Sequence, residues 1–258
     1  MYLNVDKSTF LFFWELTLST ISDNIQIKGV VMMYLVEYGL LFLGAAIAFI
    51  AQTFVSGSYS KYSKVENRNG LTGKDVARKI LDKNGLKDVT VEEVEGYLTD
   101  HYDPTKKVVR LSKSIYEDPT IASVSVAAHE CGHAIQDKVG YKAMILRNRI
   151  VPLVNFSSYA GYIAIVVGVA LGMLNLVRIG IIAELVIVAF QVITLPVEIN
   201  ASKRGMQAIK EEKFLVDDEV KSAKTMLTAA ASTYLASVVT ALLQVFRLVL
   251  VYGRRNNN

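Results

Sequence analysis

The sequence predicts a mainly α-helical protein with multi-pass membrane helices and one small α+β domain. Apolar residues make up 52% of the 258 residues and the mean hydropathy is +0.33, which is high for a soluble domain. The charged residues, 20% of the chain, are concentrated in polar segments between long apolar runs. A single Cys excludes a disulfide framework. Because basic and acidic residues are interleaved, nucleic acid is not an expected partner.

Four apolar runs are each long enough to cross about 30 Å of hydrocarbon. They cover residues 30–55, 151–177, 179–197 and 226–252. Only Arg178 separates the second run from the third, so we expect these two to form a transmembrane hairpin over residues 151–197. The fourth span and a short C-terminal tail make up residues 226–258. The lipid bilayer is therefore an expected partner.

Residues 1–29 precede the first span and include a shorter apolar stretch at 8–21. Glu15 interrupts this stretch and no small-residue cleavage site follows it, which argues against a signal peptide. We expect an interfacial segment here, and a fifth span is the alternative.

The charges near and within the spans suggest an orientation and an ion pair. Basic residues such as Lys61, Arg147 and Lys203 gather on the side of the long polar segment, which places that side in the cytoplasm, at the plasma membrane. Glu184 and Arg247 each lie about five residues inside the opposite end of a span, at similar depth. Because isolated charges are costly there, we expect Glu184 and Arg247 to pair, with Glu37 as the alternative partner.

Residues 56–150 have the composition of a soluble domain. Thr72 is expected to cap a helix that continues through Asn84. Three β-type runs follow (VTVEEV, EGYLTDHY and KVVRLS), and the turn at 103–105 predicts that the last two form a hairpin. After Pro119, a long helix capped by Thr120 is expected over TIASVSVAAHECGHAIQDK. A second polar segment, residues 198–225, separates the third and fourth spans.

The pentad His129-Glu130-Cys131-Gly132-His133 on that helix fits the pattern H-E-x-x-H. The i, i+4 spacing puts both imidazoles on one face, where they can hold one Zn²⁺. Glu130 then lies beside the metal and can take a proton from the attacking water and pass it to a leaving amine. Cys131 faces away from the imidazoles and is expected to be a small core residue. Residues 56–150 are therefore predicted to be a catalytic domain.

A catalytic zinc needs a third protein ligand and one open position. Asp137 lies on nearly the same face as His133, but one helix cannot easily place three ligands around one ion. Glu198 is favoured because a hairpin that begins and ends on one side of the membrane returns it to the face where the His pair must lie. The segment 198–225 is thus predicted to be cytosolic and to supply the third ligand.

Four segments resemble, in order and spacing, the YugP-type bacterial membrane zinc metallopeptidases: KYSKVENRNGLTGKDVARKIL, LTDHYDPTKKVVRLS, AAHECGHAIQ and TLPVEINASKRG. The resemblance covers about Met33 to Tyr252. In this family, and in the related HtpX and CAAX prenyl protease groups, a downstream Glu completes the zinc site, which implies Glu198 here. Those two groups commonly carry an acid four residues further on, where this chain has Ser202. The resemblance implies a zincin-like cytosolic catalytic domain that acts on a protein or peptide substrate.

The third His of the chain, His101, lies at the tip of the predicted hairpin. A surface histidine is one interpretation. In the other, Asp100, His101 and Tyr102 form an edge strand that pairs with an extended substrate, and His101 donates a hydrogen bond to the oxyanion, with Tyr102 as the alternative donor.

These patterns favour a membrane endopeptidase that hydrolyses peptide bonds at the cytoplasmic face. An intramembrane protease is disfavoured because Lys138 and Lys142 follow the motif at once. A non-catalytic zinc-binding scaffold or a transporter is the alternative class, although a purely structural zinc would not need Glu130. Gly168 and Gly172 form a G-x-x-x-G pattern that would allow close helix approach, so a homo-oligomer is compatible with the sequence.

Overall fold

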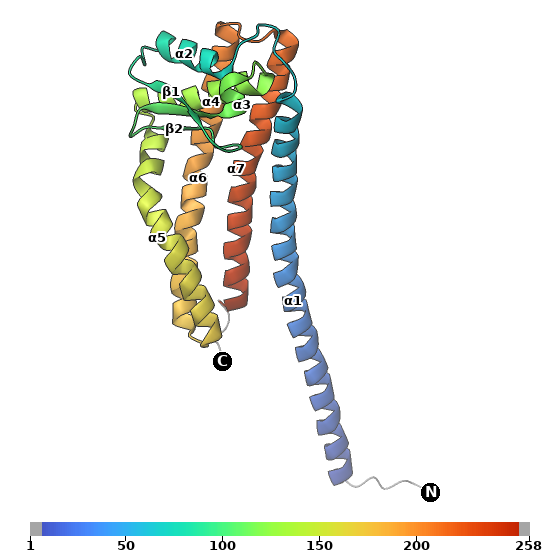
Figure 1. Ribbon diagram of the computed structural model, residues 1–258. Helices are drawn as coiled ribbons and strands as arrows, with labels where there is room; N and C mark the ends of the chain where they lie inside the picture. The colour runs from blue at the N-terminus through green and yellow to red at the C-terminus, as the bar shows by residue number, and fades with distance from the viewer. Residues whose placement is uncertain (1–6, 253–258) are drawn as a thin grey trace.

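Four long helices stand side by side, and a small α+β domain covers one end of them (Figure 1). The structure, a computed structural model, describes residues 7–252. The long helices are α1 (Lys7–Tyr62), α5 (Lys142–Ala170), α6 (Leu174–Glu211) and α7 (Asp217–Tyr252). All four contain stretches long and apolar enough to cross a membrane, as the sequence predicts.

Helix α1 is unbroken from Lys7 to Tyr62, so no break in the helix marks the predicted boundary near residue 30. It packs along α7 and leans away from the other helices toward its N-terminal end (Figure 1). Residues 1–6 of the predicted interfacial segment and the tail after Tyr252 lie outside the described residues. The interfacial position of residues 1–29 stays a prediction.

Helices α5 and α6 form the predicted hairpin, but the turn is at residues 171–173 and not at Arg178, which lies within α6. The turn forms there because Gly172 adopts a φ of +67°, a conformation that favours glycine. At Gly168 a Cβ atom would lie 2.8 Å from the backbone nitrogen of Val177, so this glycine permits the close return of the chain. Both glycines of the G-x-x-x-G pattern thus serve the hairpin within one chain.

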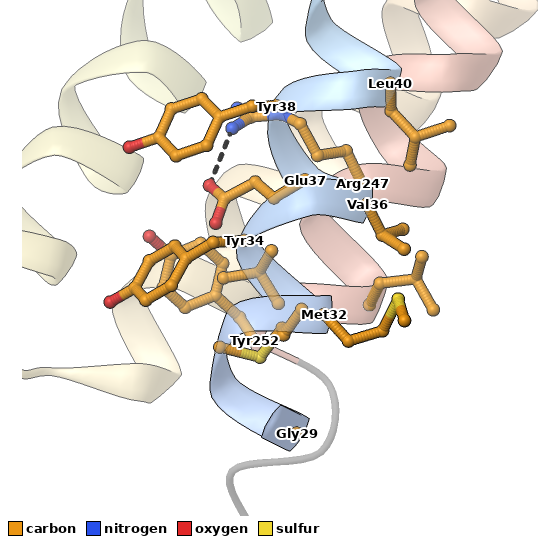
Figure 2. A pocket seen from close by; sticks show the side chains of 12 residues that line it. Gly29, Met32, Tyr34, Val36, Glu37, Tyr38, Leu40, Arg247 and Tyr252 are labelled. Atoms are coloured by element: carbon orange, nitrogen blue, oxygen red, sulfur yellow. Dashed lines mark hydrogen bonds and ion pairs between the residues drawn. The ribbon is translucent and has the colours of Figure 1, made fainter. Parts of the chain in front are cut away.

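Arg247 pairs with Glu37, so the expected pair with Glu184 is wrong and the alternative is correct. Its Nη1 donates to Glu37 Oε1 at 3.0 Å (Figure 2). Its Nε donates to Gln244 at 3.2 Å. The reason is that α1 packs along the whole of α7, which brings residue 37 onto the face that carries Arg247.

The α+β domain contains α2 (Gly73–Lys83), β1 (Thr90–Val94), β2 (His101–Asp103), β3 (Val108–Ser112), α3 (Lys113–Glu117) and α4 (Ile121–Lys138). The strand order is β1-β3-β2, with β1 parallel and β2 antiparallel to β3. The predicted strands at 89–94 and 107–112 and the hairpin are confirmed. Of the predicted run EGYLTDHY only His101 and Tyr102 are in a strand, because Gly96 and Leu98 adopt positive φ angles, and β2 lies at the sheet edge. A zincin-like relationship of this domain stays a prediction.

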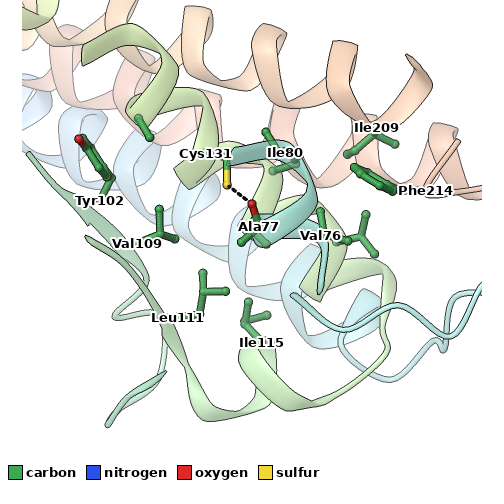
Figure 3. Close-up of a cluster of buried hydrophobic side chains, with 14 of the residues drawn as sticks. Val76, Ala77, Ile80, Tyr102, Val109, Leu111, Ile115, Cys131, Ile209 and Phe214 are labelled. Atoms are coloured by element: carbon green, nitrogen blue, oxygen red, sulfur yellow. Dashed lines mark hydrogen bonds between the residues drawn. The ribbon is translucent and has the colours of Figure 1, made fainter. Parts of the chain in front are cut away.

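The predicted helix caps of this domain are confirmed. Thr72 and Asp75 form a capping box at the start of α2, and the Thr120 hydroxyl accepts from the Ser123 amide at the start of α4. The buried core between α2, the sheet and α4 is shown in Figure 3. The Cys131 thiol lies in this core and donates to Ala77 O at 3.6 Å, and burial raises its pKa. Cys131 is therefore a core residue, as expected.

Candidate metal centre

The two histidines of α4 meet one carboxylate of α6. The Nε2 atoms of His129 and His133 lie 3.3 and 3.4 Å from Glu198 Oε2, and the three side chains have donor atoms all within 4.8 Å of one another. Glu198 is only 2% exposed and His133 is also buried. The cluster thus joins a helix of the soluble domain to a helix of the hairpin.

The cluster fits a zinc ion in both spacing and chemistry. Atoms bound at about 2.0–2.1 Å around a tetrahedral zinc are roughly 3.3–3.4 Å apart, which matches the two Nε2–Oε2 distances. Glu198 Oε2 is buried and accepts no hydrogen bond, so it holds free lone pairs beside the two ring nitrogens. Two imidazoles and one carboxylate are a ligand set typical of catalytic zinc.

Each ring is oriented through its other nitrogen. His129 Nδ1 lies 3.1 Å from the Ser202 hydroxyl, and His133 Nδ1 donates to Gln136 Oε1 at 3.0 Å. The fully buried Gln136 in turn donates to Val197 O at 2.8 Å. A proton on Nδ1 leaves the Nε2 lone pair available for a metal. Ser202, which stands where related groups carry an acid, therefore contacts a ligand ring.

The ring of His133 is also influenced by the surrounding charges. Burial disfavours the protonated ring, but the adjacent Glu198 carboxylate and the negative charge of Glu130 outweigh burial and raise the pKa of His133. A cation is thus favoured at this position.

Two glycines allow α4 and α6 to come close enough for the cluster to form. A Cβ atom on Gly132 would collide with the carbonyl of Ala201, lying 3.0 Å from its carbon. A Cβ atom on Gly205 would lie 2.8 Å from Ala128 O. Because both clashes are with backbone, rotation of a side chain cannot relieve them. Gly132, at one of the two variable positions of H-E-x-x-H, is therefore constrained by the packing of α4 against α6.

Glu130 is buried next to the ligands, and Asp100 lies nearby at the start of β2. Burial raises the pKa of Asp100, and the negative charge of Glu130 raises it further. Ser112 opposes this rise by donating to Asp100 Oδ1 from its amide at 2.7 Å and from its hydroxyl at 3.0 Å. The acid of the motif is thus flanked by a second carboxyl group from the sheet edge.

Two further residues approach Glu198 from the membrane helices. Arg147 Nη2 of α5 lies 3.8 Å from Glu198 Oε1, and its Nε is buried without a partner. Tyr234 of α7 lies near enough to Glu198, Glu130 and Arg147 to be affected by their charges. Sequence patterns do not identify Arg147, Tyr234 or Gln136 as site residues, because their proximity depends on how separate helices pack.

His101 is exposed and does not belong to the cluster. Its Nδ1 lies 2.8 Å from Thr99 O, and its Nε2 lies 3.3 Å from Arg110, its cross-strand neighbour on β3. Neighbouring residues of a strand point to opposite faces, and Tyr102 points to the α4 side, where its hydroxyl donates to Asp137 at 2.9 Å. The oxyanion role of His101 or Tyr102 stays a prediction.

Asp137, the alternative third ligand, has other partners. It accepts from Tyr102 and forms an ion pair with Lys107. The geometry therefore favours Glu198 as the third ligand.

Comparison with known proteins links this geometry to a family. A family model described as "Putative neutral zinc metallopeptidase" matches residues 37–253. The "Putative membrane protease YugP" of Bacillus subtilis (strain 168) is 47% identical over 213 residues, which are 82% of this chain and 95% of the relative. No solved structure matches the chain.

Proposed function

Because the chain belongs to the neutral zinc metallopeptidase family, we propose that it is a zinc-dependent endopeptidase that hydrolyses peptide bonds at the cytoplasmic face of the plasma membrane. The observation that carries this proposal is the meeting of His129, His133 and Glu198 around one point, next to Glu130. A cluster of two imidazoles and one carboxylate with an adjacent free acid is suited to hydrolysis.

In this proposal His129, His133 and Glu198 hold the zinc ion. The bound ion supplies Lewis-acid polarisation of the scissile carbonyl and lowers the pKa of water. Ser202 and Gln136 keep the two rings in the orientation that binding requires. Arg147 balances the negative charge of Glu198 at its second oxygen.

Glu130 is the proposed general base and acid. Its carboxylate takes a proton from the attacking water, and the same group then delivers a proton to the departing amine. Burial next to Asp100 keeps this proton transfer away from bulk solvent. A purely structural metal site would have no need of a free acid at this position.

The cytoplasmic placement rests on the basic residues that flank the spans on the side of the α+β domain. Basic residues lie next to the α+β domain in three places: at the Lys142 end of α5, in residues 203–210 of α6, and at the end of α1. The proposed substrate is a protein or peptide that reaches the membrane surface.

Metal removal tests the proposed activity. We expect the purified full-length protein to cleave casein, to lose this activity on treatment with a chelator, and to regain it when zinc is added back. Zinc-loaded protein that leaves casein and other unfolded proteins intact would favour the non-catalytic scaffold.

His101→Ala tests the predicted oxyanion donor. If His101 donates to the oxyanion, as the sequence predicts, zinc-loaded His101→Ala should lose about 10²- to 10³-fold in casein turnover at unchanged zinc content. Turnover within about threefold of the wild type would fit an exposed ring that faces Arg110 and would remove His101 from the mechanism.

A further inference from the structure

A cavity lined by both apolar and polar side chains lies among the membrane helices, on the side of the metal centre that faces away from the α+β domain. It has a volume of about 480 Å³ and lies between α1, α6 and α7. Helix α1 contributes two large apolar residues, Leu40 and Leu41, and three small ones, Gly44, Ala45 and Ala48. The polar residues that line the cavity come from α6 and α7: Glu184, Gln191, Ser237, Thr240, Gln244 and Arg247.

On α6 a row of polar residues leads from the cavity toward the metal centre. Glu184, Gln191 and Glu198 are spaced by seven residues and therefore share one face of the helix. Thr194 lies between them on the same face, is 3% exposed, and has a buried hydroxyl without a hydrogen-bond partner. Glu184 lies about 21 Å from Glu198 along the helix axis at 1.5 Å per residue.

On α7 a parallel polar row begins beside the metal centre. Tyr234, which lies near Glu198, is followed by Ser237 one turn further along the helix. The row ends at Arg247, which also lines a second cavity of about 730 Å³ near Tyr252 (Figure 2). We call the lining of the 480 Å³ cavity the polar groove.

The polar groove has one acid without a charged partner. Arg247 and Glu37 neutralise each other at 3.0 Å. Among the described residues, Glu184 forms no ion pair and no hydrogen bond with another side chain. A carboxyl group at this depth is costly and calls for a partner that supplies positive charge or hydrogen-bond donors.

We propose that the polar groove binds the transmembrane segment of a membrane-anchored substrate, and that Glu184 selects a segment with a Lys or Arg side chain. The groove lies in the apolar part of α6 and α7, where a soluble peptide does not reach. Beyond the groove, Thr194 on α6 and Tyr234 on α7 lie on the way to the metal ligand Glu198, so a chain leaving such a segment is directed toward the site of cleavage. The inference rests on the proposed peptidase function and adds its substrate class.

Charge selectivity is one test. The full-length protein is reconstituted in liposomes together with one of two reporter proteins, each with a single transmembrane span. The reporters differ only at one position of that span, which is Lys in one reporter and Leu in the other. This position lies about 14 residues from the end of the span that is nearer the metal centre. We expect the wild type to favour the Lys reporter in kcat/KM by about tenfold and Glu184→Gln to lose this preference. The lipid-facing variant Leu185→Ala, exposed on the same helix, should keep it. Equal cleavage of both reporters by the wild type would overturn the selectivity.

Crosslinking tests occupancy without any need for activity. In the Glu130→Gln background, we expect Ser237→Cys, in the groove, to form a disulfide with a cysteine in the Lys reporter, and Leu235→Cys, which is 54% exposed, not to do so. The native Cys131 is fully buried and does not compete. Equal crosslinking at both positions would indicate non-specific contact between helices in the bilayer and would refute binding in the groove. Specific crosslinking without cleavage of casein by the wild type would instead refute the peptidase function alone.

Discussion

We expect Glu130→Gln to retain a full complement of zinc and to lose about 10²- to 10⁴-fold in casein turnover. The amide keeps the size and position of the side chain but can no longer accept a proton from water. The three ligands His129, His133 and Glu198 remain unchanged, so metal content, measured as zinc per protein, should not fall.

The contrast with two other variants makes this result specific. Glu117→Gln, the same change at an exposed acid, should keep both zinc and activity. Glu198→Ala should lose the metal together with the activity. Normal turnover in Glu130→Gln would show that another group handles the protons and would refute the proposed mechanism.

Gly132→Ala should damage the metal centre by adding a single methyl group. Its Cβ atom would collide with the carbonyl of Ala201 and lie 3.1 Å from the Ala201 Cα atom. Since neither group can rotate away, α4 and α6 must move apart, and Glu198, one turn before Ala201, moves with α6. We expect zinc affinity to fall by about 10- to 100-fold and activity to fall with it.

Gly57→Ala is the matched control, because nothing lies within 4 Å of a Cβ atom at this helical position. Zinc titration and thermal unfolding of both variants would separate loss of the site from loss of the fold. A Gly132→Ala protein with normal zinc affinity would show that α4 and α6 can separate without disturbing the ligands.

Local patterns in the sequence predict the elements of this structure well. The H-E-x-x-H spacing, the Thr72 and Thr120 caps, the three strands and the four apolar runs each depend on neighbours along the chain. Glu198 could also be placed, because a membrane hairpin restricts where its two ends can lie. These predictions use periodicity and topology, which a single sequence contains.

Features that depend on the contact between separate helices could not be predicted in this way. The pairing of Arg247 with Glu37 follows from the packing of α1 on α7, and depth alone did not distinguish Glu37 from Glu184. The approach of Ser202 to His129 requires the register of α6 against α4. Whether His101 points to the solvent or toward α4 depends on the register of β2 against β3. A small change in the turn can shift this register by one residue and so reverse the face.

The division of the ligands between α4 and α6 also has a consequence for the biogenesis of the protein. Both spans of the hairpin lie between His133 and Glu198 in the chain, so synthesis of the third ligand follows synthesis of the two spans. The metal site cannot be completed until the hairpin has entered the bilayer and returned α6 to α4. If the proposed function holds, a nascent or misinserted chain carries no complete active site, and the proposed hydrolysis is confined to molecules already assembled in the membrane.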